Sequence, residues 1–345
     1  MAFESVSLFA NRGHEEALEL YRLRKSDALA FYEKYSSSFV ERACPICGET
    51  EHSEDDPFLG VYAIARCSAC QSQYVNPCPP SEALGDYYGN FQSWILADAM
   101  LARRLKEKSG YSFYERQDKV IEAIEETIQS GVDQVNVLEI GANSGAFLCA
   151  LKAKCQELGI LNKVKLSGID LDRRAVENPL DKDLNLIYGD AETFLGDRKG
   201  EYHVIVFFEL IEHLIDPFAF MCNVKNALKP GGRAALTTPN NCGFELLAIG
   251  YNSQRLLAHA IFPPMHLNAF STQNILHFAL RCGLKLNCLI TPGKLDVDML
   301  GKTKVEYQDE LLKFLATADD QTKGLAQALI RYVNGSSHML VVLAK

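Results

Sequence analysis

The stretch Val137-Leu138-Glu139-Ile140-Gly141-Ala142-Asn143-Ser144-Gly145-Ala146-Phe147-Leu148 decides the fold of this chain. An apolar run bounded by glycine is typical of a buried parallel strand. Gly141 and Gly145 permit positive φ angles and let a ligand approach the backbone closely. Amide groups at the start of the following helix favour an electron-rich ligand. The stretch therefore predicts a strand, a glycine turn and a helix that together hold a nucleotide-type cofactor.

Apolar runs alternate with amphipathic helices from Val135 to the end of the chain. Strand–helix alternation indicates parallel βαβ units. We therefore predict an α/β fold with a doubly wound, mostly parallel seven-stranded sheet of the Rossmann-like type. The strands are expected at residues 135–140, 165–170, 185–188, 203–208, 233–237, 284–290 and 338–343. Helices are expected to begin near Ala146, Asp172, Ala191, Pro217, Thr272 and Val305.

The overall composition limits the classes of function. The net charge of −9 over 345 residues argues against a mainly electrostatic grip on nucleic acid. No apolar run reaches the roughly 18–20 residues that span a bilayer. Residues 1–12 lack a basic segment followed by an apolar one, so we expect no secretory signal. These features predict a cytoplasmic protein with no membrane span, and they leave open whether it forms a homodimer.

Two CxxC pairs stand out among eleven cysteines. Cys44-Pro45-Ile46-Cys47 and Cys67-Ser68-Ala69-Cys70 are separated by 19 residues, close to the zinc pattern with about 15–20 residues between pairs. Four thiolates satisfy tetrahedral zinc and leave no open position, and a reducing compartment disfavours disulfides. We predict a structural zinc site at Cys44, Cys47, Cys67 and Cys70, with thiol redox chemistry as its rival. The other seven cysteines are expected to be small buried hydrophobic residues.

Four segments follow from these patterns. Residues 1–42 are expected to form an N-terminal helical segment, with helical periodicity from residue 14 onward. Residues 43–80 are expected to form the small zinc-binding unit, and residues 81–130 a helical linker or cap. Residues 131–345 are expected to form the cofactor-binding domain. Within that domain, residues 240–265 interrupt the alternation and are expected to form a helical lid over the sheet edge.

The type of cofactor follows from the turn and from two acids. The turn at residues 141–145 lacks the middle glycine that lets a backbone approach a pyrophosphate, which disfavours NAD, and no Gly-Lys-Ser/Thr follows, which excludes a P-loop. Asp170, at the tip of the second strand, can accept hydrogen bonds from both ribose hydroxyls, with Asp172 as its competitor. Asp190 follows the third strand and can accept from an adenine amino group or, alternatively, cap a helix. A nucleoside without phosphates fits these features best.

Four motifs occur in chain order: Glu139-Ile140-Gly141-Ala142-Asn143-Ser144-Gly145, Gly168-Ile169-Asp170, Gly189-Asp190-Ala191 and Leu228-Lys229-Pro230-Gly231-Gly232. Together they resemble the motifs of class I methyltransferases that use S-adenosylmethionine. The resemblance implies that Glu139 and the glycine turn hold the methionine part, Asp170 the ribose and Asp190 the adenine. The cofactor contacts that it implies are Glu139, Gly141, Ala142, Asn143, Gly145, Asp170, Leu171, Asp190, Ala191 and Phe208.

A Glu-x-x-Glu-His element, Glu209-Leu210-Ile211-Glu212-His213, follows the strand expected at 203–208. A helical turn there would place Glu209, Glu212 and His213 on one face. They could hold a divalent cation, act as a base toward a substrate hydroxyl, or serve only a helix start and the packing of the sheet. The element resembles a segment of ubiquinone-type O-methyltransferases and small-RNA 2′-O-methyltransferases. Because some of these bind a divalent metal there, the resemblance makes magnesium or manganese a candidate cofactor.

His266 is a fourth candidate for the acceptor side. It lies in Pro264-Met265-His266-Leu267, shortly before Ser271, a good helix N-cap. The family that the chain resembles often carries a histidine before this helix, close to the acceptor, whereas a lone histidine can also be purely structural. The predicted catalytic residues are therefore Glu209, Glu212, His213 and His266.

The whole arrangement resembles bacterial methyltransferases of surface-polysaccharide and natural-product pathways, and sugar C-methyltransferases with an N-terminal zinc unit. This resemblance implies methyl transfer from S-adenosylmethionine to a hydroxyl or carbon of a small-molecule acceptor, such as a sugar or natural-product intermediate. Two alternatives remain: an RNA 2′-O-methyltransferase, and a non-catalytic cofactor-binding scaffold whose zinc unit recruits a partner.

Overall fold

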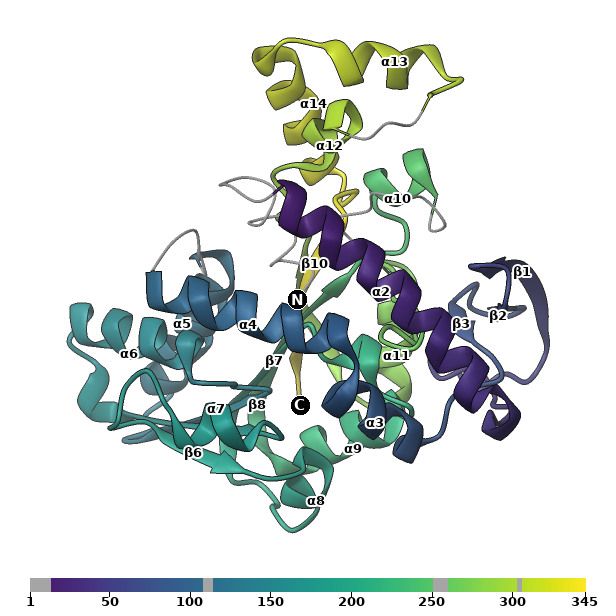
Figure 1. Cartoon of the computed structure of the whole chain (residues 1–345). Coiled ribbons are helices and arrows are strands. Elements are labelled where there is room, and N and C mark those ends of the chain that lie inside the picture. Colours follow the sequence, from purple (N-terminus) through teal and green to yellow (C-terminus); the bar gives the residue numbers. More distant parts are fainter. Residues whose placement is uncertain (1–13, 108–113, 251–259, 303–305) are drawn as a thin grey trace.

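A seven-stranded sheet forms the centre of the molecule (Figure 1). The computed structural model describes residues 14–107, 114–250, 260–302 and 306–345. The strand order is β6 (Asn185–Tyr188), β5 (Val164–Asp170), β4 (Val135–Ile140), β7 (Tyr202–Phe208), β8 (Leu228–Pro239), β10 (His338–Ala344) and β9 (Lys285–Ile290). The first five strands in this order pair in parallel, whereas β10 runs antiparallel to both of its neighbours.

This sheet confirms the predicted α/β fold with its mostly parallel seven-stranded sheet. All seven predicted strands are present, and the largest difference in bounds is at β8, which begins at Leu228 rather than at Arg233. The central strand β7 is almost wholly buried. Helices cover both of its faces, which is why its sequence is continuously apolar rather than alternating.

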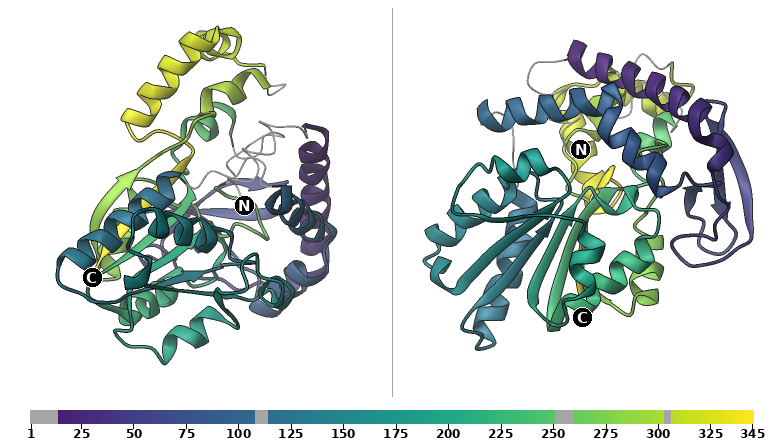
Figure 2. Two further views of the ribbon diagram at one scale, coloured as in Figure 1. Left: turned by 90° about the vertical axis from the view of Figure 1, so that its left-hand side faces the viewer. Right: turned by 60° about the horizontal axis from the view of Figure 1, so that its bottom comes forward.

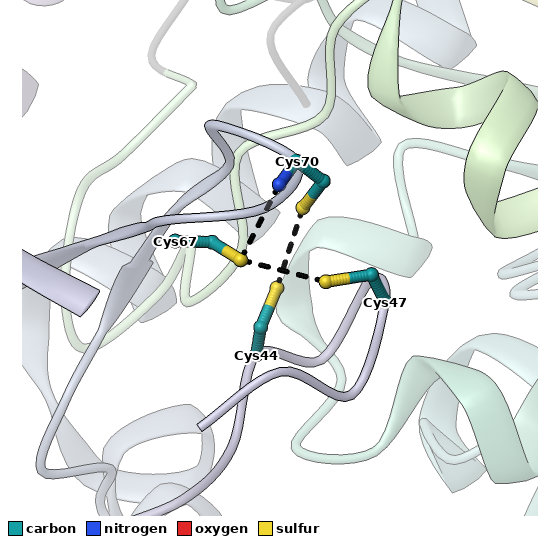
Figure 3. A group of neighbouring side chains, drawn as sticks. All are labelled: Cys44, Cys47, Cys67 and Cys70. Carbon is teal, nitrogen blue, oxygen red and sulfur yellow. Dashed lines mark hydrogen bonds between the residues drawn. The ribbon is translucent and has the colours of Figure 1, made fainter. Parts of the chain in front are cut away.

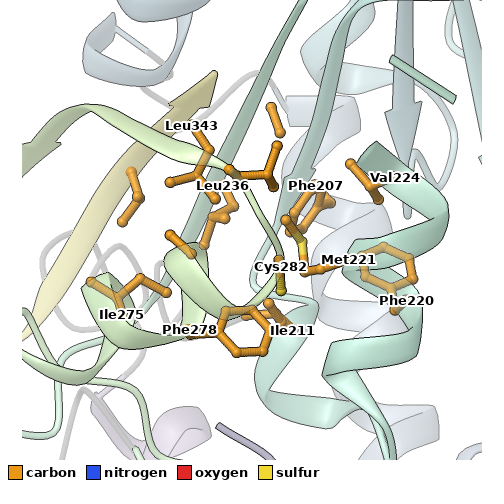
Figure 4. Close-up of a cluster of buried hydrophobic side chains, with 14 of the residues drawn as sticks. Phe207, Ile211, Phe220, Met221, Val224, Leu236, Ile275, Phe278, Cys282 and Leu343 are labelled. Carbon is orange, nitrogen blue, oxygen red and sulfur yellow. The ribbon is translucent and has the colours of Figure 1, made fainter. Parts of the chain in front are cut away.

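Helices pack on both faces of the sheet. α5 (Tyr114–Gln129) and α6 (Ala146–Glu157) cover one face, and α9 (Pro217–Ala227) and α11 (Asn274–Arg281) cover the other. Figure 4 shows how Phe220 and Met221 of α9 and Phe278 of α11 meet Phe207 of β7 and Leu236 of β8. The sheet therefore has a separate apolar core on each face.

Most predicted helix starts are confirmed. α6, α8 (Ala191–Gly196) and α9 begin at the predicted residues, and α7 (Arg173–Glu177) begins directly after its N-cap, Asp172. α11 begins at Asn274 rather than at Thr272. The helix start predicted near Val305 lies outside the described residues.

The N-terminal part consists of helices and a small sheet. α2 (His14–Tyr35) ends earlier than the predicted residue 42, and a 3-10 turn, η1 (Ser36–Ser38), follows it. β1 (His52–Phe58), β2 (Tyr62–Cys67) and β3 (Gln73–Val75) form an antiparallel sheet that the sequence did not predict. α3 (Ser81–Asn90) and α4 (Gln92–Glu107) come next, and α4 lies alongside α2 (Figure 2).

A second core joins this N-terminal part to the C-terminal half. Phe31 of α2, Tyr62 of β2 and Tyr87 of α3 are buried together with Phe262. The Tyr62 hydroxyl also donates to the Ala28 carbonyl at 2.6 Å. The N-terminal helices and small sheet therefore share a hydrophobic core with the C-terminal half and are an integral part of the fold.

The predicted lid at residues 240–265 is described only in part. Its residues 251–259 lie outside the described residues. The described parts are the short helix α10 (Phe244–Ile249) and residues 260–265, which are buried in the second core. No described helix is both long enough and apolar enough to cross a bilayer.

Three helices stand out from the sheet at one end of the molecule (Figure 1). α12 (Asp296–Lys302), α13 (Glu310–Thr317) and α14 (Asp320–Tyr332) are inserted between β9 and β10. They pack together around Val297, Leu300 and Leu315.

Replacing Phe31 with alanine tests whether α2 is integral to the fold. Phe31 is fully buried, with Tyr87 edge-on at 5.7 Å between ring centroids. We expect Phe31→Ala to lower the free energy of unfolding by about 3–5 kcal/mol, because it leaves a cavity. Leu29→Ala, at an exposed site on the same helix, should change it by no more than about 0.5 kcal/mol. Chemical denaturation measures both, and equal effects would contradict this packing.

Candidate active site

The strand order reverses between β4 and β7, which is where ligands bind in sheets of this kind. The glycine turn follows β4, and the Glu-x-x-Glu-His element follows β7. Because β4 and β7 pair directly, with Ile140 beside Phe207, the two motifs emerge side by side at the carboxyl edge of the sheet.

The glycine turn has the backbone shape that its sequence indicates. Gly141, Asn143 and Gly145 have φ angles of 76°, 48° and 84°, a region where glycine and asparagine are the best-tolerated residues. A Cβ added to Gly141 would meet no atom within 4 Å. The turn therefore borders open space on its outer side, as a cofactor site requires.

Asp170 connects the glycine turn to the next loop. Its Oδ2 accepts from the Asn143 amide at 2.7 Å, and its Oδ1 accepts from the Asp172 amide at 2.7 Å. A carboxylate oxygen can accept more than one hydrogen bond, so these contacts leave capacity for a ligand. The competitor Asp172 caps α7 by accepting from the amides of Arg174 and Ala175.

Asp190 caps a helix, the alternative role that its sequence context suggested. Its Oδ1 accepts from the Thr193 amide and hydroxyl, both at 2.8 Å. The other expected cofactor residues lie along the same edge: Leu171 is exposed, and Ala191 and Phe208 are half-buried. The structure therefore places the expected cofactor contacts at the tips of four adjacent strands, β6, β5, β4 and β7.

Glu139 is a buried acid at this edge. Burial raises its pKa well above the usual value, and the charge of Asp170 raises it further. Its Oε2 has no hydrogen-bond partner within the described part of the chain. A cationic group bound beside Glu139 would supply a partner and lower that pKa.

Glu209 does not lie in a helical turn, so the shared face predicted for Glu209, Glu212 and His213 is wrong. Its φ is 51°, a left-handed conformation that costs of order 1–3 kcal/mol for such a residue. The 3-10 turn η3 (Ile211–His213) begins only two residues later. The amide of Glu209 donates to the Thr237 carbonyl at 2.9 Å, and this hydrogen bond helps hold the backbone of Glu209 in its left-handed conformation.

The side chain of Glu209 belongs to a charged cluster. Its Oε1 lies 3.5 Å from Nη2 of Arg116, and its Oε2 lies 3.5 Å from Nε2 of His338. Burial alone would raise the pKa of Glu209, but His338 and Arg116 outweigh it and hold the pKa well below the usual range. Glu209 is therefore ionised at neutral pH.

Glu212, His213 and His266 form a separate group, which we call the acceptor triad because these residues are predicted from the sequence to lie on the acceptor side. One ligand atom from each lies within 4.8 Å of those of the others. The imidazole rings are perpendicular, with centroids 4.7 Å apart. Thr238 Oγ1 donates to Glu212 Oε2 at 3.0 Å, and the Tyr88 hydroxyl lies 3.2 Å from His213 Nδ1.

The acceptor triad has buried polar atoms that no protein group satisfies among the described residues. Glu212 is 0% exposed. Its Oε1 and the Nε2 of His213 have no hydrogen-bond partner among the residues that the structure describes. Burial and the charge of Glu209 raise the pKa of Glu212 to about 8, and burial lowers the pKa of His213 to about 3. His213 is therefore neutral at physiological pH, and its Nε2 can accept a hydrogen bond.

The donor set of the acceptor triad differs from the expected metal set. His266 takes the place of Glu209, which gives two imidazole nitrogens and one carboxylate. Magnesium prefers oxygen ligands in an octahedral arrangement, whereas imidazole suits transition metals. The residues that come together therefore fit magnesium poorly.

A short segment of backbone holds His266 in place; we call residues 265–269 the strap. On one edge, the amides of Leu267 and Asn268 donate to the Glu212 carbonyl at 2.8 and 3.2 Å. On the other edge, Val75 N donates to Leu267 O and Ala269 N donates to Gln73 O, both at 2.9 Å. The strap therefore connects the acceptor triad to β3 of the cysteine unit.

The four cysteines of the CxxC pairs converge (Figure 3). The sulfur atoms of Cys44 and Cys70 are 3.6 Å apart, and those of Cys47 and Cys67 are 3.4 Å apart. These distances are too long for disulfides, and all four cysteines are free thiols. They approach the S–S separation of about 3.8 Å that tetrahedral zinc imposes with Zn–S bonds of about 2.3 Å. The donor set fits a structural zinc ion.

Helix α11 fastens the cysteine cluster to the large sheet. Arg281 Nη1 donates to the carbonyls of Pro45 and Ile46 at 3.3 and 3.2 Å. Its guanidinium also lies over the ring of Phe218, 3.9 Å from the centroid. Asn274 donates to the Ser72 hydroxyl at 3.0 Å, and that oxygen lies 2.8 Å from the sulfur of Cys70.

Four residues of the site were not predicted from the sequence: Arg116, His338, Tyr88 and Thr238. Arg116 and Tyr88 come from helices that carry no motif. A polar residue at the start of an apolar strand is a signal that could have drawn attention to His338. Thr238 carries no such local signal, because its role depends on the position of Glu212.

Comparison with known proteins gives a consistent result. A methyltransferase domain model matches residues 102–289. No curated protein matches the chain. A SAM-dependent methyltransferase from Archaeoglobus fulgidus aligns with a TM-score of 0.40 and 15% identity, over 66% of this chain and 94% of that one. The plantazolicin methyltransferase BamL aligns with a TM-score of 0.46 and 13% identity, over 76% and 93%.

The raised pKa of Glu212 gives stability a pH dependence. Between about pH 4.5 and 8 the Glu212 carboxyl has lost its proton in the unfolded chain but keeps it in the folded chain. The free energy of unfolding should then fall with rising pH, by up to about 1.4 kcal/mol per unit from this group. We expect Glu212→Gln to remove this part of the fall, measured by denaturation at several pH values.

The control for this measurement is Glu54→Gln, at an exposed site on β1. It should keep the slope of the wild type. A difference between Glu212→Gln and the wild type that stays constant with pH would contradict a raised pKa for Glu212.

Proposed function

The chain belongs to the S-adenosylmethionine-dependent methyltransferases, and we propose that it methylates a hydroxyl or carbon of a small-molecule acceptor. The observation that carries this proposal is the acceptor triad. It is a buried group of two histidines and one acid beside the cofactor edge of the sheet, with polar atoms that no described protein group satisfies.

The cofactor edge supplies contacts to each part of S-adenosylmethionine. When bound, the cofactor supplies a methyl group already activated on a sulfonium. Asp170 would accept hydrogen bonds from the ribose, and Asp190 would accept from the adenine through the oxygen that does not cap α8. The open turn at residues 141–145 would hold the methionine part. The unpartnered oxygen of Glu139 suits its cationic groups, and Arg116 suits its carboxylate.

The acceptor triad removes the proton that methylation releases. A hydroxyl is a weak nucleophile until a base takes its proton, and the base must lie within hydrogen-bond reach. We assign this step to His266, whose ring lies 4.7 Å from that of His213, centroid to centroid. Burial lowers the pKa of His213 and makes it a weak base, so its role is to hold the acceptor by a hydrogen bond. Glu212 orients the group through its contact with Thr238. The ionised Glu209 lies 3.5 Å from both Arg116 and His338, next to the acceptor triad.

The alternative functions have less support. An RNA acceptor is disfavoured by the net charge of −9, because nucleic-acid affinity depends on basic surface. A non-catalytic scaffold would not need a buried group of proton-accepting side chains beside the cofactor edge, since buried polar groups without partners are costly. A small-molecule acceptor accounts for both observations.

A metal-assisted version of the same reaction has one observation in its favour. The ligand atoms of Glu212, His213 and His266 lie close enough together to bind one ion. Their nitrogen-rich donor set suits iron, nickel or zinc better than magnesium or manganese. In this version the acceptor triad would bind the metal and the metal would position the acceptor oxygen.

The cysteine cluster completes the proposal as a structural zinc site. Zinc held by Cys44, Cys47, Cys67 and Cys70 would have no open position and no chemical role. Its effect would be to fix β3, and through β3 the strap that carries His266.

Two variants separate the cofactor side from the acceptor side. Asp170→Ala should weaken binding of S-adenosylhomocysteine by about 10–100-fold, because it removes charged hydrogen bonds. His266→Ala should lower turnover by at least about 100-fold and leave that affinity within about threefold of the wild type. Calorimetry measures binding, and release of S-adenosylhomocysteine with a panel of hydroxylated small molecules measures turnover.

Asp183→Ala and His277→Ala serve as matched controls at exposed positions, and both should behave like the wild type. Unchanged turnover in His266→Ala would refute its role as base. Cofactor binding without turnover on any acceptor would favour the scaffold. If chelation abolishes turnover and Fe²⁺ or Ni²⁺ restores it while the zinc of the cysteine cluster stays bound, the metal-assisted version is correct.

The zinc site is tested by Cys67→Ser. We expect the variant to lose both zinc and solubility, because three ligands bind the ion weakly and the knuckle then unfolds. Elemental analysis of the purified wild type should give about one zinc per chain. Cys222→Ser, outside the cluster, should keep its zinc. Full zinc content in Cys67→Ser would refute the assignment.

A further inference from the structure

Helix α14 carries an apolar stripe on its outer side. Leu325, Leu329 and Tyr332 are 68%, 62% and 86% exposed. They follow one another at intervals of four and three residues and so share one face of the helix. Single exposed apolar residues are ordinary, but large ones aligned along successive turns are typical of an interface. With three further exposed residues they form what we call the α14 stripe: Gln321, Gly324, Leu325, Ala328, Leu329 and Tyr332.

The opposite side of α14 already attaches it to its own chain. Ala326 and Ile330 pack on the core of the three-helix unit. Gln327 donates to Asp296 Oδ2 at 2.7 Å and to the Gly293 carbonyl at 3.1 Å. Figure 2 shows α14 at the outer edge of the molecule, with no other described element over its outer side. The α14 stripe is therefore not needed for folding of the single chain.

Gly324 points to a close neighbour on this face. A glycine inside a helix costs roughly 1 kcal/mol relative to alanine. A Cβ added to Gly324 would meet no atom within 4 Å, so the folded chain does not itself require the missing side chain. A bare helix surface flanked by leucines allows another helix to approach closely.

We propose that the α14 stripe binds the α14 stripe of a second copy of this chain, with the two helices antiparallel. The two-fold axis passes between the two helices at the level of residues 326 and 327. Each large side chain of one copy then lies at the same height as a small or polar side chain of the other copy. Leu325 then faces Ala328 of the second copy, Leu329 faces Gly324, and Tyr332 faces Gln321. Large residues opposite small ones let two helices interdigitate. Such a self-complementary contact closes as a dimer.

The charged residues at the ends of α14 favour the antiparallel arrangement. Asp320 lies in the first turn and Arg331 in the last. At 1.5 Å per residue, Arg331 of one copy lies about 3 Å along the axis from Asp320 of the other. Parallel helices would instead place Asp320 beside Asp320, Arg331 beside Arg331 and Leu325 beside Leu325. Opposed helix dipoles favour the same antiparallel choice.

The size of the contact sets the expected strength. α14 has 13 residues, so the pair buries an area at the small end of specific interfaces. We expect reversible association with a dissociation constant on the order of micromolar.

Sedimentation velocity on the full chain, from about 1 to 200 µM, tests the proposal. The wild type should shift from monomer to dimer with concentration. Leu329→Glu and Gly324→Leu should each weaken the dimer at least about tenfold. Gly324→Leu is the sharper variant, because it improves helix propensity and fills open space in the single chain. At low concentration, where the chain is monomeric, the melting temperature of Gly324→Leu should not fall. A role of Gly324 in folding of the single chain would instead lower it.

Leu280→Glu, at an equally exposed leucine on α11, should leave the dimer intact. A charge exchange tests the orientation: Asp320→Arg and Arg331→Asp should each weaken the dimer, and the double variant should restore it. Three results would overturn the proposal. They are a wild type that stays monomeric throughout, a dimer that survives Leu329→Glu or Gly324→Leu, and a double charge variant no stronger than the single ones.

Discussion

The proposed acceptor side of this enzyme depends on one short piece of backbone that is hydrogen-bonded on both edges. The strap, residues 265–269, pairs with β3 on one edge and with the Glu212 carbonyl on the other. Backbone hydrogen bonds fix position more firmly than the packing of mobile side chains, because the main chain has few soft dihedrals. His266 therefore cannot shift relative to Glu212 and His213 unless a ladder of main-chain bonds breaks. Arg42 strengthens the same junction by donating to the carbonyls of Val75, Ile215 and Leu267.

The two sides of the site are assembled differently. The cofactor side comes from one continuous stretch, in which successive strands of a single sheet end at a common edge. The acceptor side instead draws on α3, η3 and the strap, which are far apart in sequence and meet through the second core. Changes in the N-terminal segments can thus alter the acceptor side while the cofactor edge keeps its geometry.

This difference explains how much could be predicted from the sequence. Buried parallel strands leave continuous apolar runs, and glycine turns and strand-tip acids mark their ends, so the sheet and the cofactor edge were readable. The position predicted for Glu209 was wrong because its left-handed backbone accompanies a hydrogen bond to Thr237 of β8, a contact that the local pattern does not reveal. Arg116 and His338 lie far from Glu209 along the chain, and only tertiary structure brings them together. The short strand β1 is largely polar and exposed, so it gave no apolar signal.

The attachment of the cysteine cluster to α11 has a consequence for how the protein is made. Cys44 and Cys67 are buried in the same core as Phe278 of α11, and Asn274 and Arg281 complete their surroundings. These residues lie about 200 positions further along the chain, which corresponds to roughly 10–40 s of elongation at typical rates of synthesis. During that interval the four thiols have left the ribosome, but the interior that will cover them does not yet exist. The time at which the four thiols come together, relative to the synthesis of α11, is therefore part of the folding pathway of this protein.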